Sequence, residues 1–257
     1  MYYYLYDSFL VDKKYKKLVA DIETRASELG ISGKIIKLSL LKNVKEVVED
    51  ISKEENPTIV IVGRDKTFSE AVSANWKSKN TLFGFIPAGG YSELSFILDL
   101  PKGADGCDVV SQRRVLQMDL GRVNNSLFFT YLEFSAKDVL LSSPLGWQII
   151  PKHCSKIRVI NLGFRQNPVP GSTEFLVSQP QDEYLEIVTL KRKTKYFIPL
   201  KTETIDSLFF VKQIQIKSTK KENNLFIEES KQTIKSPFNI KISSRKVKII
   251  VGRERMI

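Results

Sequence analysis

Two short apolar runs, each ending at a glycine-bearing turn, constrain the fold of this 257-residue chain more than any other feature. Thr58–Val62 is followed by Gly63, an acid and a hydroxyl, and then by residues at helical spacing. Thr81–Ile86 is followed by a proline and by Gly89. A buried strand, a turn and a helix in this order can place backbone N–H groups around an anion. We expect both turns to lie at one edge of a sheet.

Strands and helices alternate along the first 115 residues. The strands expected from apolar runs are Tyr2–Tyr6, Lys34–Leu38, Thr58–Val62 and Thr81–Ile86, and the helices expected from 3.6-residue spacing are Leu18–Leu29, Val44–Ile51 and a segment around Phe68–Val72. This alternation favours right-handed βαβ units and a parallel sheet covered on both faces. We therefore expect an α/β domain over residues 1–115.

After residue 115 the pattern changes to short, partly alternating segments separated by Gly, Pro, Asn and Lys-rich turns. These segments are Leu116–Leu120, Ser126–Phe134, Ile157–Leu162, Glu174–Val177, Tyr184–Leu190, Phe209–Ile216, Phe238–Ile242 and Val247–Val251. Many short strands at such intervals favour an antiparallel β-sandwich. We expect a β-rich second domain over residues 116–257, with a last strand that could return to the first domain.

The net charge of +11 belongs to the second part of the chain. Residues 1–150 hold 19 Lys and Arg and 19 Asp and Glu, whereas residues 151–257 hold 21 and 10. A strongly basic part suits an anionic surface, either phospholipid headgroups or nucleic acid. The alternative is a set of solvated strand faces whose lysines protect sheet edges from pairing.

The sequence contains no apolar run near the roughly 20 residues that span a bilayer. We therefore expect no transmembrane segment and a cytoplasmic protein, with peripheral attachment to the inner face of the membrane. Cys107 and Cys154 fit reduced thiols in such a compartment better than a disulfide scaffold. His153 is the only histidine, so a zinc site is not expected.

Five motifs in chain order resemble the diacylglycerol kinase catalytic-domain family, which includes bacterial lipid kinases and sphingosine kinases. Gly63–Thr67 resembles its Gly-Gly-Asp-Gly-Thr motif, and Pro87–Glu93 its Pro-Xaa-Gly-Thr-Xaa-Asn motif. Met118–Asn124 and Asp182–Val188 resemble two segments of its second domain, and Leu225–Ser230 stands where the family has a Val-Asp-Gly-Glu turn. The resemblance implies a fold like that of diacylglycerol and NAD kinases, with a nucleotide-binding α/β domain and a lipid-binding β-rich domain.

Several positions depart from the family's pattern. Arg64 and Lys66 replace glycines that would let backbone N–H groups approach a phosphate, although side-chain cations can themselves bind phosphate. The family's first loop, of the Asn-Pro-Xaa-Ser-Gly type, is represented only by Asp7–Asp12. Gly90 and Ser92 stand where the family prefers Thr and Asn.

The resemblance assigns site residues by position. The nucleotide would be held by Gly63, Arg64, Asp65, Lys66, Thr67, Glu70, Gly89, Gly90 and Ser92. Asp65 and Asp182 would bind Mg²⁺, and Asp65 and Glu229 would be the catalytic residues, with Glu229 as the base. In a second register Glu228 takes the family's Asp position and Ser230 replaces the base. Asp65 could instead cap a helix, and Asp182 could cap a turn.

We expect an enzyme that transfers the γ-phosphoryl group of ATP, with Mg²⁺, to a lipid hydroxyl such as that of diacylglycerol at an anionic membrane surface. The alternative is a catalytically inactive relative that binds nucleotide or lipid and works through a partner. Nucleic-acid binding ranks last, because no RNP-like motif or recognition-helix pattern supports it. The acceptor lipid, the nucleotide preference and a homodimeric state are left open.

Overall fold

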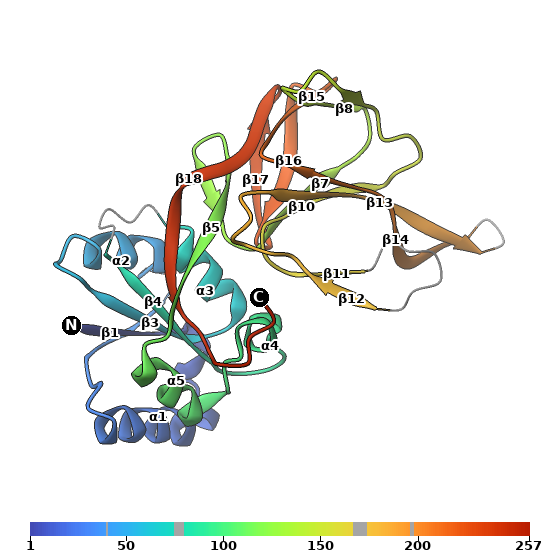
Figure 1. The fold of residues 1–257 in the computed structure, drawn as a ribbon. Coiled ribbons are helices and arrows are strands. Elements are labelled where there is room, and N and C mark those ends of the chain that lie inside the picture. Colours follow the sequence, from blue (N-terminus) through green and yellow to red (C-terminus); the bar gives the residue numbers. More distant parts are fainter. Residues whose placement is uncertain (40, 75–79, 167–173, 196–197) are drawn as a thin grey trace. The chain divides into compact units, whose positions relative to one another are not determined.

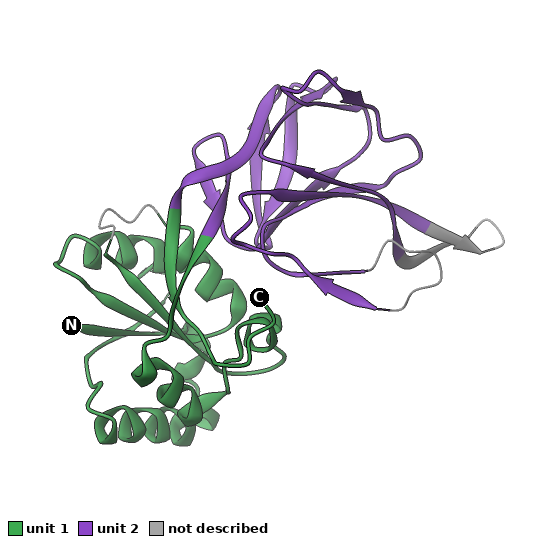
Figure 2. Cartoon of the chain, in the orientation of Figure 1, with its two compact units in different colours: residues 1–118, 246–257 green, residues 119–245 purple. Residues whose placement is uncertain are grey.

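The computed structural model describes residues 1–39, 41–74, 80–166, 174–195 and 198–257 (Figure 1). Two compact units divide these residues (Figure 2). The first comprises residues 1–118 and 246–257, and the second comprises residues 119–245. The first unit is thus discontinuous, because the chain returns to it after completing the second. The expected boundary after residue 115 lies three residues before this division.

The first unit is built on a parallel sheet with the strand order β2-β1-β3-β4. These strands are β1 Tyr2–Tyr6, β2 Lys34–Lys37, β3 Thr58–Gly63 and β4 Leu82–Pro87. The end of β18, Phe238–Ile250, pairs in parallel with β4. Every residue of β3 and β4 is buried, as expected for central strands covered on both faces. The α/β class predicted from the sequence is confirmed.

Helices cover this sheet. The α-helices are α1 Lys16–Glu28, α2 Val44–Ile51, α3 Asp65–Val72, α4 Glu93–Leu98 and α5 Gly106–Gln112, and the short 3-10 helices are η1 Ser8–Val11, η2 Lys13–Tyr15 and η3 Gly103–Asp105. Four apolar residues of α2 at i, i+3, i+4 and i+7 are all buried. The sequence did not predict α4 and α5, which have six and seven residues.

The strand order places a topological switch point between β1 and β3. From β1 the chain passes through α1 to β2 on one side, and then through α2 to β3 on the other side of β1. The loops after β1 and β3 therefore leave the sheet in different directions at the same edge. In open α/β sheets, ligands bind in the crevice outside the carboxyl ends of strands at such a point.

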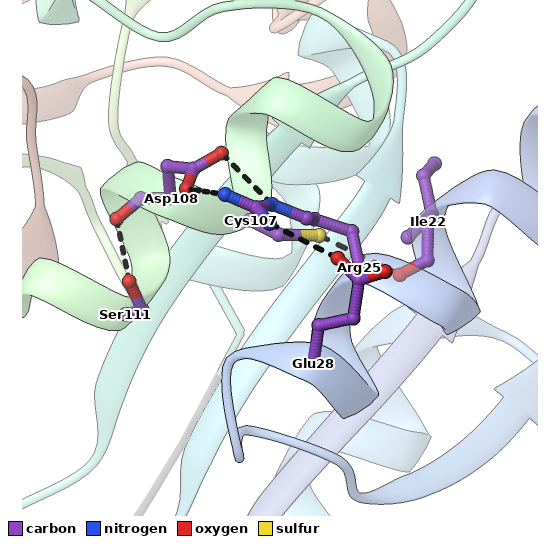
Figure 3. A network of polar contacts seen from close by, with 6 residues as sticks. All are labelled: Ile22, Arg25, Glu28, Cys107, Asp108 and Ser111. Atoms are coloured by element: carbon purple, nitrogen blue, oxygen red, sulfur yellow. Dashed lines mark hydrogen bonds and ion pairs between the residues drawn. The ribbon is translucent and has the colours of Figure 1, made fainter.

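Helices α1 and α5 are joined by a polar network (Figure 3). The Arg25 guanidinium donates through Nη2 to Asp108 Oδ1 at 2.6 Å and through Nε to Asp108 Oδ2 at 3.3 Å, and it also bonds Glu28 at 3.0 Å. Beside it, the Cys107 thiol is fully buried and donates to the Ile22 carbonyl at 3.6 Å. Burial raises the pKa of Cys107 to about 11, so this thiol is a packing group.

The second unit contains two antiparallel layers around one core. The six-stranded sheet has the order β14-β13-β10-β7-β16-β17, with β7 Tyr131–Ser135, β10 Lys156–Ile160, β13 Leu185–Lys195, β14 Ile198–Val211, β16 Glu222–Ile227 and β17 Ser230–Lys235. The other layer joins the first part of β18 to β15 Gln213–Ser218, β8 Val139–Ser142 and β9 Gln148–Ile149. Core side chains come from both layers, including Leu132, Ile187, Leu141, Ile214 and Phe238. The sandwich-like second domain is confirmed.

The remaining strands connect or flank these layers. They are β5 Val115–Val123, β6 Ser126–Phe128, β11 Phe164–Gln166 and β12 Phe175–Val177. The run predicted as one strand over Ser126–Phe134 is two strands, because side chains bind the backbone between them. Phe129 N donates to the Glu228 carboxylate, and Phe129 O accepts from Asn161 Nδ2 at 2.7 Å. These groups are therefore lost to the strand ladder.

Three further strand predictions were wrong in their limits. The run Phe209–Ile216 is divided between the end of β14 and β15, which belong to different layers. Conversely, Phe238–Ile242 and Val247–Val251 are parts of one strand, β18, which ends at Ile250. The sequence predicted a connection between residues 242 and 247. The structure instead has one long strand, which passes from one unit to the other without a turn.

The two cysteines provide a test of the core. At pH 8 a thiol with a pKa of about 11 is thiolate in only about one molecule in a thousand, and Cys107 is also inaccessible. Cys154 is half-buried. We expect one thiol to react with an aromatic disulfide reagent in the native protein and two in denaturant. Cys107→Ala should leave the native count unchanged, and a native count of two would contradict this packing.

Candidate functional site

Asp7 lies at the carboxyl end of β1, next to the switch point. Its backbone N–H donates to Val62 O at 2.9 Å and so extends the pairing of β1 with β3. The Asp7 side chain is 6% exposed, and its carboxylate accepts from Thr67 Oγ1 at 2.6 Å and from Arg64 Nε at 3.4 Å. A buried carboxylate therefore joins the loop after β1 to the first turn of α3.

Gly63 is required here for space. A Cβ on Gly63 would lie 2.6 Å from the Asp7 Cβ, closer than real side chains approach. Gly63 O also accepts from Ala88 N at 2.8 Å, which extends β3 against the loop after β4. Gly89 in that loop has a φ of +99°, a backbone conformation that favours glycine. The neighbouring Gly90 is exposed and has open space around it.

The two cations that replace family glycines lie at the surface of this edge. The Arg64 side chain is 59% exposed, and its guanidinium carbon lies 4.7 Å from the centre of the Phe9 ring. Together with the Asp7 contact, this stacking places the guanidinium over the loop after β1. Lys66 is exposed one residue into α3.

Asp65 joins α3 to α4. Its Oδ1 accepts from Ser92 Oγ, and its Oδ2 accepts from Leu94 N at 3.1 Å. Ser92 is buried and caps α4, because its Oγ accepts from Ser95 N at 2.9 Å. The sequence predicted a functional acid or a local cap at Asp65, whereas its carboxylate supports a helix that begins 28 residues later in the chain.

A cavity of about 240 Å³ opens at this edge of the first unit. Its lining is mostly polar and comes from the ends of β1 and β2 and the starts of α2 and α3: Asp7, Ser8, Leu38, Ser39, Lys42, Asn43, Val44, Thr67 and Glu70. Asn43 also caps α2 by accepting from Lys45 N at 2.8 Å. Two carboxylates, a lysine, an amide and several hydroxyls suit a polar ligand with hydroxyl or amino groups. The sequence predicted Thr67 and Glu70 but gave Asp7 no role beyond its loop.

The Glu228-Glu229 pair forms a two-residue hairpin turn between β16 and β17 in the second unit. Both residues have positive φ, 49° and 69°, as in the hairpin turn that favours Asn or Asp followed by Gly. The Glu228 side chain is buried and accepts from Phe129 N and from Thr130 N at 3.0 Å. Glu229 is exposed. The two acids in this turn therefore have different environments.

Asp182 and Asp65, the two expected metal ligands, lie in different units. Asp182 is exposed, and its Oδ1 accepts from Tyr184 N at 2.8 Å, as in a turn cap. Both Asp65 oxygens accept hydrogen bonds. Within the described ranges, no three His, Cys, Asp or Glu side chains gather around a common point. The side chains as placed do not fit a protein-built Mg²⁺ site.

Asn161 is a buried residue that the sequence reasoning did not single out. It follows β10, is 1% exposed, and donates from Nδ2 to Asp119 O at 3.0 Å and to Phe129 O at 2.7 Å. Asp119 in turn accepts from Glu183 N at 2.9 Å. An asparagine directly after an apolar strand was the available signal, because such a residue is buried only when its amide is bonded.

The fold of the chain is that of diacylglycerol and NAD kinases. The chain is similar to a diacylglycerol kinase from Bacillus anthracis str. Sterne, with a TM-score of 0.74 and 15% identity over 100% of this chain and 98% of that one. It is also similar to an NAD kinase from Archaeoglobus fulgidus in complex with ATP, with a TM-score of 0.60 and 13% identity over 100% and 96% of the two chains. No curated protein matches the chain in sequence.

Residues 5–123 match the family described as the diacylglycerol kinase catalytic domain. This part of the chain therefore carries a diacylglycerol kinase catalytic domain, in which Arg64 and Lys66 replace glycines of the family's motif. The resemblance read from the sequence is confirmed. Within the described residues, no helix combines the length and apolar character needed to cross a bilayer.

The contact between Gly63 and Asp7 can be tested with two glycine variants. Gly63→Ala should lower the free energy of unfolding by about 1–3 kcal/mol, because the new methyl group overlaps a buried side chain. Gly90→Ala is the matched control, since its Cβ would meet no atom within 4 Å. Urea denaturation measures both. Equal stability of the two variants would show that β1 and β3 can separate at this edge without cost.

The two acids of the hairpin turn should also differ in stability. Glu228→Ala should cost about 2 kcal/mol or more, because it leaves two backbone donors near Phe129 without their acceptor. Glu229→Ala, in the same turn but exposed, should change the free energy of unfolding by less than about 0.5 kcal/mol. Thermal and urea unfolding of both variants provide the measurement. A larger loss for Glu229→Ala would overturn the assignment of Glu228 as the anchor.

Proposed function

We propose that this protein binds ATP at the carboxyl edge of its parallel sheet and transfers the γ-phosphoryl group to a lipid hydroxyl. The observation that carries the proposal is the polar cavity at the β1–β3 switch point, within a diacylglycerol kinase catalytic domain. A solved structure of similar fold, the Archaeoglobus fulgidus NAD kinase, is a complex with ATP. Diacylglycerol is the acceptor suggested by the domain family.

From the charges of the site, we expect two groups of residues to bind different parts of the nucleotide. The cavity presents the carboxylates of Asp7 and Glu70, which suit the ribose hydroxyls or the amino group of the base. Among the described lining residues these carboxylates outnumber the one cation, Lys42, so the cavity on balance repels phosphate. The phosphates would instead meet Arg64 and Lys66 and the backbone near Gly89. Arg64 is mostly exposed and its contact with Asp7 is 3.4 Å long, so it can turn toward a phosphate at small cost.

The proposed reaction relies on positioning and charge neutralisation more than on covalent help from the protein. Glu229 is the proposed base, because its carboxylate is exposed whereas that of Glu228 is engaged by backbone donors. Because the carboxylates do not form a metal site of their own, Mg²⁺ is proposed only as the ion that accompanies the ATP phosphates. The basic second part of the chain would face an anionic membrane surface from the cytoplasmic side.

A catalytically inactive relative that binds nucleotide or lipid is the second candidate. It is favoured by the use of acidic side chains in structural roles. Asp7, Asp65 and Glu228 each accept hydrogen bonds that join separate segments of the chain. The hairpin geometry also supports the register in which Glu228 and Glu229 take the positions of an Asp-Gly turn, which leaves Ser230 in the place of the base.

The ATP site can be tested by thermal shift and calorimetry. Saturating Mg-ATP should raise the melting temperature, because a ligand that binds only the native state stabilises it by mass action. Arg64→Gln with Lys66→Gln should weaken binding by about tenfold or more, since hydrogen bonds to charged groups contribute about 1.5–3 kcal/mol each. Lys34→Gln with Lys37→Gln removes the same charge from exposed positions on β2 and should leave the affinity unchanged.

Activity separates the two candidates. The parent protein should transfer labelled phosphate from ATP to diacylglycerol in mixed micelles, and Glu229→Ala should abolish the transfer while leaving ATP binding intact. Binding without transfer would support the inactive relative. The absence of any shift with millimolar Mg-ATP would remove the nucleotide site itself.

A further inference from the structure

A second cavity, of about 370 Å³, lies within the second unit. Three separate segments line it: the loop between β8 and β9, the residue before β13, and the junction of β14 and β15. Its lining residues are Ser143, Pro144, Leu145, Trp147, Tyr184, Phe210, Val211, Lys212 and Gln213. The volume falls in the range of about 300–1,000 Å³ that is usual for small-molecule sites.

Large apolar side chains around this cavity are left in contact with solvent. Leu145 is 87% exposed, Phe210 is 52% exposed and Tyr184 is 40% exposed. Single exposed apolar residues are ordinary, but several around one hollow indicate a surface that is covered in use. Two aromatic rings and a leucine suit an aliphatic chain better than a polar ligand.

The wall of the cavity is held by the core behind it. Phe209 and Phe210 are neighbours on β14, so their side chains point to opposite faces. Phe209 packs against Trp147 with ring centres 6.0 Å apart, and both contact the main core of the unit. Trp147 therefore touches the core and also lines the cavity, which gives the hollow a fixed wall.

The side chain of Lys212 lines the cavity and carries a positive charge. The Lys212 Nζ lies 5.1 Å from the centre of the Tyr184 ring and 3.4 Å from Glu183 Oε2. Both side chains of this ion pair are more than half exposed, so the pair contributes little and can open at small cost. Among the described residues that line the cavity, Lys212 is the only charged one. An anionic group attached to an apolar chain would complement this arrangement.

We infer that this cavity binds a single-chain anionic amphiphile, with the alkyl chain between Leu145, Tyr184 and Phe210 and the anionic headgroup at Lys212. The headgroup could be the carboxylate of a fatty acid or the phosphate of a lysophospholipid, which share this chemistry. The inference does not rest on the proposed phosphotransfer. Every residue that it uses lies in the second unit, whereas the cavity proposed for the nucleotide lies in the first.

Trp147 allows the inference to be tested directly. In a Trp76→Phe background Trp147 is the only tryptophan, so energy transfer to bound cis-parinaric acid reports binding near the cavity. We expect saturable quenching with one site per chain. Phe210→Ser and Leu145→Ser should each weaken binding at least tenfold. Phe226→Ser, which changes a 41% exposed phenylalanine on β16 that does not line the cavity, should leave binding unchanged.

Competition establishes the headgroup. Dodecanoate and dodecyl phosphate should displace the probe better than dodecylammonium or dodecanol, and Lys212→Met should remove that preference while the chain still binds. Whichever of the two anions competes better identifies the source of the headgroup. Circular dichroism and melting temperatures of each variant exclude unfolding as the cause.

Three results would overturn the inference. They are the absence of saturable quenching, equal binding by the Phe210→Ser and Phe226→Ser variants, and equal displacement by cationic and anionic amphiphiles. Sedimentation of the parent protein as a dimer that Leu145→Ser converts to a monomer would assign the apolar rim to a second copy of the chain instead.

Discussion

The close approach of Asp7 to Gly63 is the contact on which the rest of the first unit depends. With no side chain on Gly63, β1 and β3 can end side by side, and the buried Asp7 carboxylate can reach Thr67. The same carboxylate lines the polar cavity and faces Arg64, so one group takes part in packing, in the shape of the cavity and in its charge. A residue larger than glycine would disturb all three together.

Most of the first unit could be predicted from the sequence because local patterns determine it. The limits of β1 and α2 are those expected, since a strand buried on both faces reads as a continuous apolar run and an amphipathic helix as a 3.6-residue repeat. The short helices α4 and α5 leave too few residues for a period to be seen. The division of the second unit into two layers was also predicted, although several strand limits were not.

The parts that could not be predicted depend on contacts between distant residues. Phe129 leaves the strand ladder because Asn161 and Glu228, 32 and 99 residues away, bind its backbone. Asp65 has the local signature of a helix start, yet its carboxylate supports α4 through Ser92 and Leu94. A sequence motif shows where such an acid stands in the chain. Only the folded structure shows which of its carboxylate oxygens already accept hydrogen bonds.

The discontinuity of the first unit has a consequence for synthesis on the ribosome. Residues 246–250 complete its sheet beside β4, but 127 residues of the second unit are made before they emerge. Until then β4 keeps an open hydrogen-bonding edge, which is the kind of surface that promotes pairing with other chains. The second unit can fold first, as an insertion within an unfinished host, and the first unit can close only afterwards. This order of assembly makes the nascent chain, rather than the finished protein, the stage most exposed to aggregation.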